Sequence, residues 1–478
     1  MIYDTIIVGG GIGGCSTAAL LNAKKYNVLL IEKEPTLGGC ASTFKHKGNL
    51  YKAGATTLAG YHEGGIVHRL CETVGVNPPL ISTDPAITII QGSRHCIRYR
   101  DVERFIGEME RFYPHPKHAE FWRLVDTIGK TFYSMDGYYY SNRTWIKKFC
   151  SLLSFFPMIK NFRPYLLGDA KTFIKTFYGS ITPEYLDFLD AQIMIVAQAS
   201  SEKVNFLTAA LSLGYTFNET HYPIGGMGAL CSAITSKLPA IRLGCTVESI
   251  SLSEGIYHLT TSDGNFKAKN IVIGTALYGL NPLFAETKIN HYYQRYQSLN
   301  NHQSAFVLYM TLRSSHRFEH HYQLIASDII PDTLSKALFV SFSDPSDTLI
   351  APSGEYRITA SIHTDARWWI GLTPSVYKHK KLSLQELLLH WILDTLSLNK
   401  EDVTQCFSAT PKTFGRYLHR TQLGGNALTH SNALPFLPAN ETPIQGFYNV
   451  GDTSYPAQGW PGVVMGAFNT LRMIDGRN

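Results

Sequence analysis

The sequence predicts an α/β fold in which a doubly wound, mostly parallel sheet is interrupted by an inserted α+β part. Two glycine-rich stretches, GGGIGG near the start and YNVGDTSYPAQGWPGVV near the end, lie at opposite ends of the 478 residues. Between them the pattern changes from helical to strand-like, with runs such as SAFVLYMTL and YRITASIHT. We therefore expect a discontinuous first domain whose pieces meet around one ligand.

The N-terminal segment has the pattern of a Rossmann-type dinucleotide-binding unit. Residues 2–8 (IYDTIIV) are apolar and β-branched, as expected for a buried parallel strand. Gly9, Gly11 and Gly14 follow in GxGxxG spacing and open a helix of small residues. Glu32 ends the next apolar strand, about twenty residues further on, where an acid can accept ribose hydroxyls. The glycines allow a tight turn and a close approach to a pyrophosphate, so this unit predicts a bound dinucleotide.

Several stretches together carry a resemblance to a known family. GGGIGG…IEKEPTLGGCAS resembles the FAD-dependent amine-oxidase-like flavoproteins, and within them the branch of phytoene desaturases, carotenoid isomerases and retinol saturases. YPIGGMGAL (222–230), ATPKTFGRYLHRTQLGG (409–425) and the closing glycine-rich stretch are similar to segments of that branch and occur in its order. The resemblance implies that both glycine-rich stretches hold one FAD.

The same resemblance implies where the cofactor contacts lie. The first stretch would hold the phosphates, Val247 would touch the adenine through its backbone, and the C-terminal stretch would meet the ribityl chain and the isoalloxazine ring. The implied cofactor-binding residues are Gly9, Gly11, Gly13, Gly14, Glu32, Lys33, Gly39, Cys40, Ala41, Ser42, Val247, Gly451, Asp452, Gly462 and Val463.

The domain organisation follows from these positions. We expect residues 1–75, 221–280 and 435–478 to form the FAD-binding domain, and residues 76–220 and 281–434 to form the substrate domain. The middle piece of the first domain reads as short alternating strands with an Asp-Gly turn. A second GxGxxG followed by a helix is absent from the sequence, so we expect no separate nicotinamide-binding domain.

The resemblance implies an FAD-dependent oxidoreductase that acts on a lipophilic polyisoprenoid or carotenoid-like substrate. Desaturation, saturation and cis–trans isomerisation of C=C bonds all remain open, and a desaturase would pass electrons to quinone or oxygen. Two alternatives also remain: an amine-oxidase-type enzyme with a polar substrate, and a non-catalytic protein that holds flavin and an isoprenoid. Weak candidates for proton transfer are Arg416, Tyr417 and Tyr455, which lie in the two stretches most similar to the family's cavity.

Residues 141–179 predict contact with a membrane surface. This segment holds seven Lys or Arg residues and a single acid, Asp169, interleaved with aromatic and aliphatic residues. Basic amphipathic helices of this composition bind well at an anionic membrane interface. The alternative is a pair of core-packed helices with solvated lysines.

Composition limits the remaining functions. A formal charge of +6 is too small for this length to indicate nucleic acid binding. The eight cysteines show neither CxxC nor zinc-ligand spacing, so we expect free thiols in a reducing cytoplasm and no metal site. Together with the basic segment, this predicts a cytoplasmic protein bound peripherally to the inner face of a membrane.

Three smaller features have ordinary interpretations. Lys52, in Tyr51-Lys52-Ala53-Gly54, stands where the family usually has an acid. A cation near the flavin would stabilise its reduced, anionic form, but we expect a solvated surface lysine. The histidines at 316, 320 and 321 are expected in a polar loop. Cys40 is interpreted as a small packing residue, because the sequence shows nothing that would stabilise a thiolate.

Overall fold

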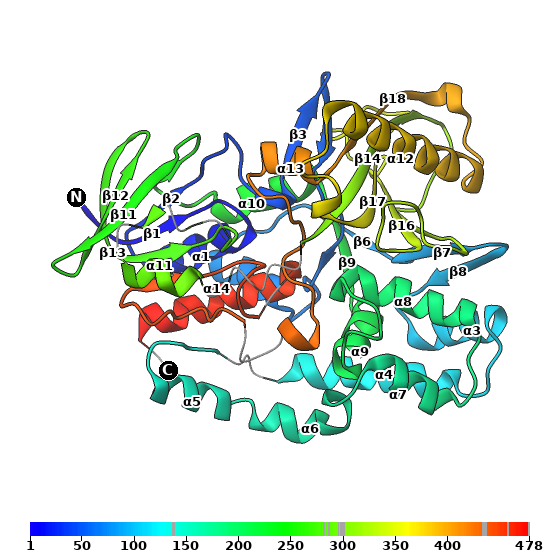
Figure 1. Cartoon of the computed structure of the whole chain (residues 1–478), viewed down its shortest axis with the longest axis horizontal. Coiled ribbons are helices and arrows are strands. Elements are labelled where there is room, and N and C mark those ends of the chain that lie inside the picture. Colours follow the sequence, from blue (N-terminus) through cyan, green and yellow to red (C-terminus); the bar gives the residue numbers. More distant parts are fainter. Residues whose placement is uncertain are drawn as a thin grey trace.

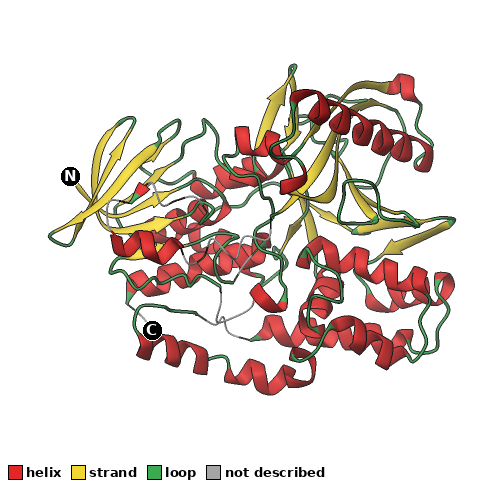
Figure 2. Ribbon diagram, in the orientation of Figure 1, coloured by secondary structure: helices red, strands yellow, loops and turns green. Residues whose placement is uncertain are grey.

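The computed structural model describes residues 1–135, 139–278, 280, 283–284, 287–294, 296, 302–432, 437–456 and 458–476. Two seven-stranded sheets organise these residues, and they lie at opposite ends of the molecule's long axis (Figure 1). Helices line the lower side of both sheets in this view (Figure 2). Residues 281, 434 and 435, at expected domain boundaries, lie outside the described residues.

The first sheet has the order β10-β2-β1-β13-β12-β11, and β19 pairs with β13. The central strand β1 pairs in parallel with both β2 and β13. A hairpin joins β12 to β13 at the expected Asp-Gly turn. The strands, drawn from three distant stretches of chain, are β1 (Ile2–Val8), β2 (Val28–Ile31), β10 (Ile241–Arg242), β11 (Val247–Ser253), β12 (Ile256–Thr261), β13 (Gly264–Ile273) and β19 (Phe447–Asn449).

Both faces of this sheet are buried, which explains why β1 and β2 are continuous apolar runs rather than alternating ones. On one face Ile7 and Leu30 pack against a helical layer, and on the other Ile6 and Leu29 pack toward α11. The helices around this sheet are α1 (Ile12–Ala23), α2 (Ile66–Val74), α10 (Gly226–Thr235), α11 (Thr287–Gln294) and α14 (Gly459–Asp475). The first and last helices of the chain, α1 and α14, therefore share one core.

The second sheet has the order β18-β14-β17-β16-β15-β7-β8. Its strands come from two stretches of sequence, one before and one after the segment that forms β10 to β13 of the first sheet. Among its pairings, only that of β7 with β15 is parallel. Helix α12 covers one face through Leu384, Leu388 and Ile392. The elements are β7 (Ile87–Gln91), β8 (Arg94–Arg98), β14 (Gln303–Arg313), β15 (His321–Ile325), β16 (Ala337–Phe342), β17 (Glu355–Asp365), α12 (Pro374–Thr395) and β18 (Val403–Ala409).

A helical layer and some short strands complete the fold. The layer has its own core, centred on Trp122 and Phe188, while α5 and α6 lie along its outer edge (Figure 1). Its helices are α3 (Val102–Phe112), α4 (His118–Ser134), α5 (Trp145–Leu153), α6 (Phe156–Leu166), α7 (Ala170–Tyr178), α8 (Pro183–Ala197) and α9 (Phe206–Gly214). The short elements are β3 (Thr43–His46), β4 (Asn49–Lys52), β5 (Leu58–Ala59), β6 (Leu80–Thr83), β9 (Thr220–Pro223) and α13 (Pro411–Tyr417).

Among the described helices, none is both long enough and apolar enough to cross a membrane.

Candidate active site

A cavity of about 1090 Å³ extends from the first sheet to the second. Both glycine-rich stretches line it, together with residues of α8, α9 and one face of the second sheet. On that face the row Val307, Ser361, Phe339 and Gln323 runs across four paired strands. The volume slightly exceeds the range of about 300–1,000 Å³ that is typical of small-molecule sites. It therefore suits a large ligand.

The three glycines of the GxGxxG turn have different structural roles. Gly9 has φ +107°, a conformation that favours glycine, and it begins the turn from β1 to α1. A Cβ on Gly14 would lie 1.9 Å from the carbonyl oxygen of Gly9, so this glycine is required for helix–strand packing. A Cβ on Gly11 would lie no closer than 3.8 Å to the protein and would occupy the cavity. Gly11 thus leaves space for a ligand rather than for the protein itself.

Glu32 is held at the end of β2 by two backbone amides. Its Oε2 accepts a hydrogen bond from the Gly10 amide at 2.5 Å, and its Oε1 accepts one from the Glu34 amide at 2.8 Å. Val247 at the start of β11 also lines this part of the cavity, whereas the exposed Lys33 lies at its rim. Glu32 and Val247 are thus brought together as expected for an adenosine site.

The second glycine pair packs directly on the first turn. The Gly38 amide donates to the Gly10 carbonyl at 2.8 Å, and a Cβ on Gly39 would lie 3.3 Å from the Cα of Gly11. Cys40 follows in the cavity wall, where burial raises the pKa of its thiol against the opposing effect of Arg420. The thiol is therefore kept protonated, in agreement with a packing role.

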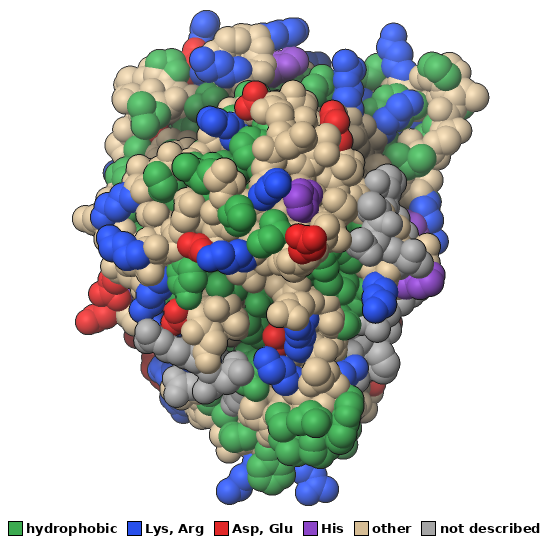
Figure 3. Space-filling model, turned by 90° about the vertical axis from the view of Figure 1, so that its left-hand side faces the viewer, with side chains coloured by type: hydrophobic (Ala, Val, Ile, Leu, Met, Phe, Trp, Pro, Cys, Tyr) green, Lys and Arg blue, Asp and Glu red, His purple; other side chains and the backbone are tan. Residues whose placement is uncertain are grey.

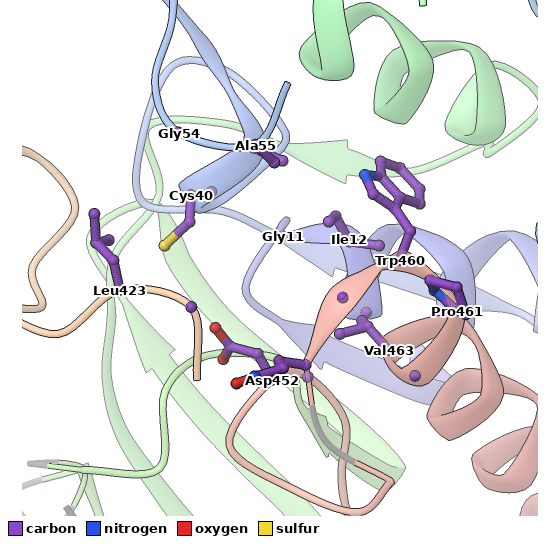
Figure 4. A pocket seen from close by; sticks show the side chains of 18 of the residues that line it. Gly11, Ile12, Cys40, Gly54, Ala55, Leu423, Asp452, Trp460, Pro461 and Val463 are labelled. Atoms are coloured by element: carbon purple, nitrogen blue, oxygen red, sulfur yellow. The ribbon is translucent and has the colours of Figure 1, made fainter. Parts of the chain in front are cut away.

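The C-terminal stretch supplies the opposite wall. Asp452 accepts from Nη1 of Arg420 with both carboxylate oxygens at 3.1 Å, and it faces the cavity beside Cys40 and Leu423 (Figure 4). The first turn of α14, from Gly459 to Val463, lines the cavity close to Ile12 of α1 (Figure 4). Neither α1 nor α14 has a side-chain N-cap. Two uncapped helix N-termini therefore face one cavity, and both favour negative charge there.

Most of the sequence-predicted contacts meet in this cavity. Gly14 and Ser42 do not line it, because Gly14 packs beneath the turn and Ser42 continues the chain behind Ala41. Those that line it are Gly9, Gly11, Gly13, Glu32, Lys33, Gly39, Cys40, Ala41, Val247, Gly451, Asp452, Gly462 and Val463.

The three proton-transfer candidates have different positions. Tyr455 lines the cavity, and its ring contacts those of Tyr140 and Phe155, each at a centroid distance of 5.9 Å. Arg416 and Tyr417 are exposed at the end of α13 and do not line the cavity. Helix α13 turns Phe414 into the core, so these two side chains point away, and their prediction as cavity residues is wrong.

Lys52 is the main correction to the sequence interpretation. It is only 6% exposed, and its ammonium lies 3.5 Å from the centroid of the Tyr222 ring. Burial lowers the pKa of Lys52 to about 7, although Asp347 and Asp344 oppose this effect. The expected surface lysine is therefore a buried group with two carboxylates nearby, both of which come from a loop almost 300 residues later.

The interpretation of the histidines is also partly wrong. His321 begins β15 and is 1% exposed, and His320 is bonded to Asp344 at 2.7 Å. His316 and His320 lie in the loop before β15, as expected, and only His321 belongs to a strand. A further histidine, His363 on β17, lines the cavity, and burial lowers its pKa to about 4, so its imidazole is neutral. The alternation of side chains along β17 could have indicated from the sequence that His363 faces the cavity.

The wall of the cavity contains buried polar atoms that have no partner in the described structure. They are Nδ1 of His62, Oε1 of Gln198, Nη2 of Arg420, Oε1 of Gln458 and Nε1 of Trp460. Unsatisfied groups of this kind cost free energy unless a ligand or water pairs with them. Together with the open cradle at Gly11 and the two helix N-termini, they fit a large anionic dinucleotide with a polar ring at its far end.

Comparison with known proteins agrees with this geometry. A family model for NAD(P)-binding Rossmann-like domains matches residues 7–74. The chain is 24% identical to a chloroplastic prolycopene isomerase of Daucus carota, over 96% of this chain and 77% of the isomerase. An oxidoreductase structure from Methanosarcina mazei superposes with a TM-score of 0.67 at 17% identity, covering 98% of this chain and 99% of the other. A putrescine oxidase structure gives 0.63 at 12% identity, covering 100% and 99%.

The fold and the site define the class of protein first: a Rossmann-type α/β enzyme with the architecture of the amine oxidases. Within that class, the resemblance to the branch of phytoene desaturases, carotenoid isomerases and retinol saturases is confirmed, since the match to the prolycopene isomerase extends over 96% of this chain. The protein is thus an oxidoreductase-type enzyme that resembles this branch over almost its whole length.

Proposed function

We propose that the cavity binds FAD, with its adenosine at Glu32 and Val247 and its isoalloxazine ring at the first turn of α14. The observation that carries this proposal is the meeting of the two uncapped helix N-termini, α1 and α14, in one cavity that continues beyond them. FAD supplies two-electron chemistry, and the chain's residues hold and orient it. Arg420 and Asp452 are well placed to fix the ribityl chain between the two ends.

The remaining part of the cavity supports a lipophilic polyene as the substrate. Beyond the glycine-rich stretches the wall becomes mainly apolar, with residues from α4, α8, α9 and the second sheet. This set includes Phe132, Met135, Met194, Ile195, Leu211, Val307 and Phe339. The prolycopene isomerase named above is related over nearly the whole chain. We propose that the enzyme acts on C=C bonds of a carotenoid-like chain, with isomerisation as the first reaction to test.

The test is to reduce the FAD-loaded protein without oxygen and to add prolycopene in phosphatidylcholine vesicles. A shift of the polyene spectrum while the flavin stays reduced indicates isomerisation, and flavin reoxidation with loss of polyene absorbance indicates saturation. With oxidised flavin and a quinone, new conjugation would indicate desaturation. Flavin reduction by putrescine instead, with no response to the polyene, would overturn the polyene proposal in favour of an amine oxidase.

We also propose that the protein works peripherally at the cytoplasmic face of a membrane. Seven large hydrophobic side chains of α5, α6 and the following turn are between 44% and 81% exposed, and we call them the apolar face. They are Trp145, Ile146, Phe149, Leu153, Phe156, Ile159 and Leu167. A hydrophobic patch flanked by basic side chains is visible at the lower end of Figure 3. Residues 141–168 contain no acid, so charge also favours an anionic surface.

A further inference from the structure

A buried imidazole is connected to the cavity by hydrogen bonds at both of its ring nitrogens. Nε2 of His321 lies 3.0 Å from Oγ1 of Thr57, and Nδ1 lies 3.1 Å from Oγ of Ser341. Ser341 in turn donates to Oγ1 of Thr56 at 2.8 Å. Thr56 and Thr57 are adjacent in sequence, and both line the cavity. The chain of bonds therefore begins and ends at the cavity wall.

The fold holds this arrangement in place. His321 on β15 and Ser341 on β16 are directly paired across the two strands. Both are buried, at 1% and 3% exposure, so bulk water does not reach them. The threonines lie in the loop between β4 and β5, immediately after Gly54 and Ala55, which Figure 4 shows across the cavity from Trp460. One link thus joins the second sheet to the part of the cavity where the cofactor ring is proposed.

The direction of the bonds follows from the donors. Because Ser341 donates to Thr56, it accepts from His321, and Nδ1 must carry the hydrogen. Nε2 is then an acceptor for the hydroxyl of Thr57. This leaves Thr57 able to accept a proton from a ligand in the cavity, while Thr56 keeps a hydrogen that it can donate to that ligand.

We propose that Thr57, His321, Ser341 and Thr56 form a proton relay that takes a proton from the substrate at one point and returns one at a second point. As Thr57 accepts the substrate's proton, its own hydrogen passes to Nε2 of His321. The Nδ1 hydrogen passes to Ser341, whose hydrogen passes to Thr56, and Thr56 donates to the substrate. No electrons move in the relay, and the only net change is the tautomer of His321. This inference rests on the proposed function: a proton shift along the polyene leaves a former C=C bond single and free to rotate, and the reverse shift restores the double bond and the first tautomer of His321.

The electrostatic surroundings of His321 favour a neutral ring that passes a proton on, and they disfavour a ring that holds a positive charge. Burial lowers the pKa of His321 well below its usual value, and His320 and Lys52 act in the same direction. Asp344 is bonded to His320, and Asp347 accepts from Tyr222 beside Lys52, so both carboxylates are engaged with other groups. An imidazolium is therefore disfavoured, and a proton can enter the ring only as another leaves.

The test compares His321→Gln with His320→Gln in the FAD-loaded full chain, with prolycopene in vesicles as the probe. Glutamine can keep one hydrogen bond but cannot change tautomer. We expect turnover to fall at least about tenfold in His321→Gln, with a changed solvent deuterium isotope effect. His320→Gln, at the neighbouring position but outside the relay, should stay within about twofold of wild type. A His321→Gln enzyme with the wild-type rate and isotope effect would overturn the relay.

Two further measurements keep this result independent of folding and of the probe. Thr57→Val preserves shape and removes the entry hydroxyl, so it should reproduce the loss without disturbing the buried imidazole. Nitrogen-15 NMR of wild-type His321, assigned from its absence in His321→Gln, needs no turnover. A neutral ring with its hydrogen on Nδ1 supports the relay even where prolycopene is not converted, whereas a ring with its hydrogen on Nε2, or one charged at pH 7, contradicts it.

Discussion

At the scale of single residues, the structure places charge where the sequence suggested none. Lys52 carries an ammonium into a buried site, and its counter-charges come from Asp344 and Asp347. Arg420 lies in the segment that follows α13, and it pairs with Asp452. No local pattern could have shown either pairing, because each partner comes from a distant part of the chain. The sequence correctly placed at the cavity those residues whose neighbours in sequence define their position, such as Gly9 and Glu32.

The buried Lys52 predicts a pH-dependent stability. In the folded protein its pKa is about 7, whereas its ordinary value is 10.5. Between these values the unfolded chain binds more protons, so the free energy of unfolding should rise as the pH increases from about 7 to 10. Lys52→Met should remove up to about 4 kcal/mol of this rise. Urea unfolding at several pH values measures it, with the exposed Lys45→Met as control; equal slopes for both variants would contradict the buried position.

At the scale of elements, the turn between β1 and α1 contains one glycine that is needed for folding and another that is needed for ligand binding. The GxGxxG pattern predicted the strand, turn and helix correctly, because each glycine acts within this local unit. The resemblance placed Gly462 and Val463 at the same ligand as the first turn, but only the structure shows that they begin α14 and that this helix packs on α1.

Two alanine variants of this turn should behave differently. Gly14→Ala would force a Cβ against the carbonyl of Gly9, and we expect a loss of more than about 3 kcal/mol of stability or no folded protein. Gly11→Ala places its Cβ in the cavity, so the apoprotein should unfold within about 1 kcal/mol of wild type, while FAD should bind at least about tenfold more weakly. Thermal unfolding and flavin fluorescence titration measure the two effects. Gly107→Ala, in an open part of α3, is the control.

The helices α5 and α6 make a second prediction at this scale. Replacing Trp145 and Phe149 by alanine should reduce binding to phosphatidylserine vesicles several-fold, because both side chains belong to the apolar face. The matched control replaces Leu349 and Val376, which are also exposed but lie elsewhere. Vesicle sedimentation measures the bound fraction. Equal binding by both double variants, or no binding by the wild type, would exclude the apolar face as the membrane contact.

At the scale of the whole molecule, one cavity depends on both ends of the chain and on both sheets. The first and last helices pack together, and the second sheet closes the cavity from the other side. The sequence could predict that the two glycine-rich stretches serve one ligand, because the resemblance covered both. It could not predict the sheet face opposite them, where His363 and Ser361 of β17 and the relay residues His321 and Ser341 gather only through strand pairing.

The central claim is that this cavity holds FAD, and its most direct test is the cofactor content of the purified wild-type protein. We predict a yellow protein with a flavin absorption spectrum that releases about one FAD per chain on denaturation, measured by chromatography against protein concentration. Apoprotein should regain this spectrum when FAD is added. A colourless protein that neither carries FAD nor binds added FAD would contradict the account, because both glycine-rich stretches would then need another ligand.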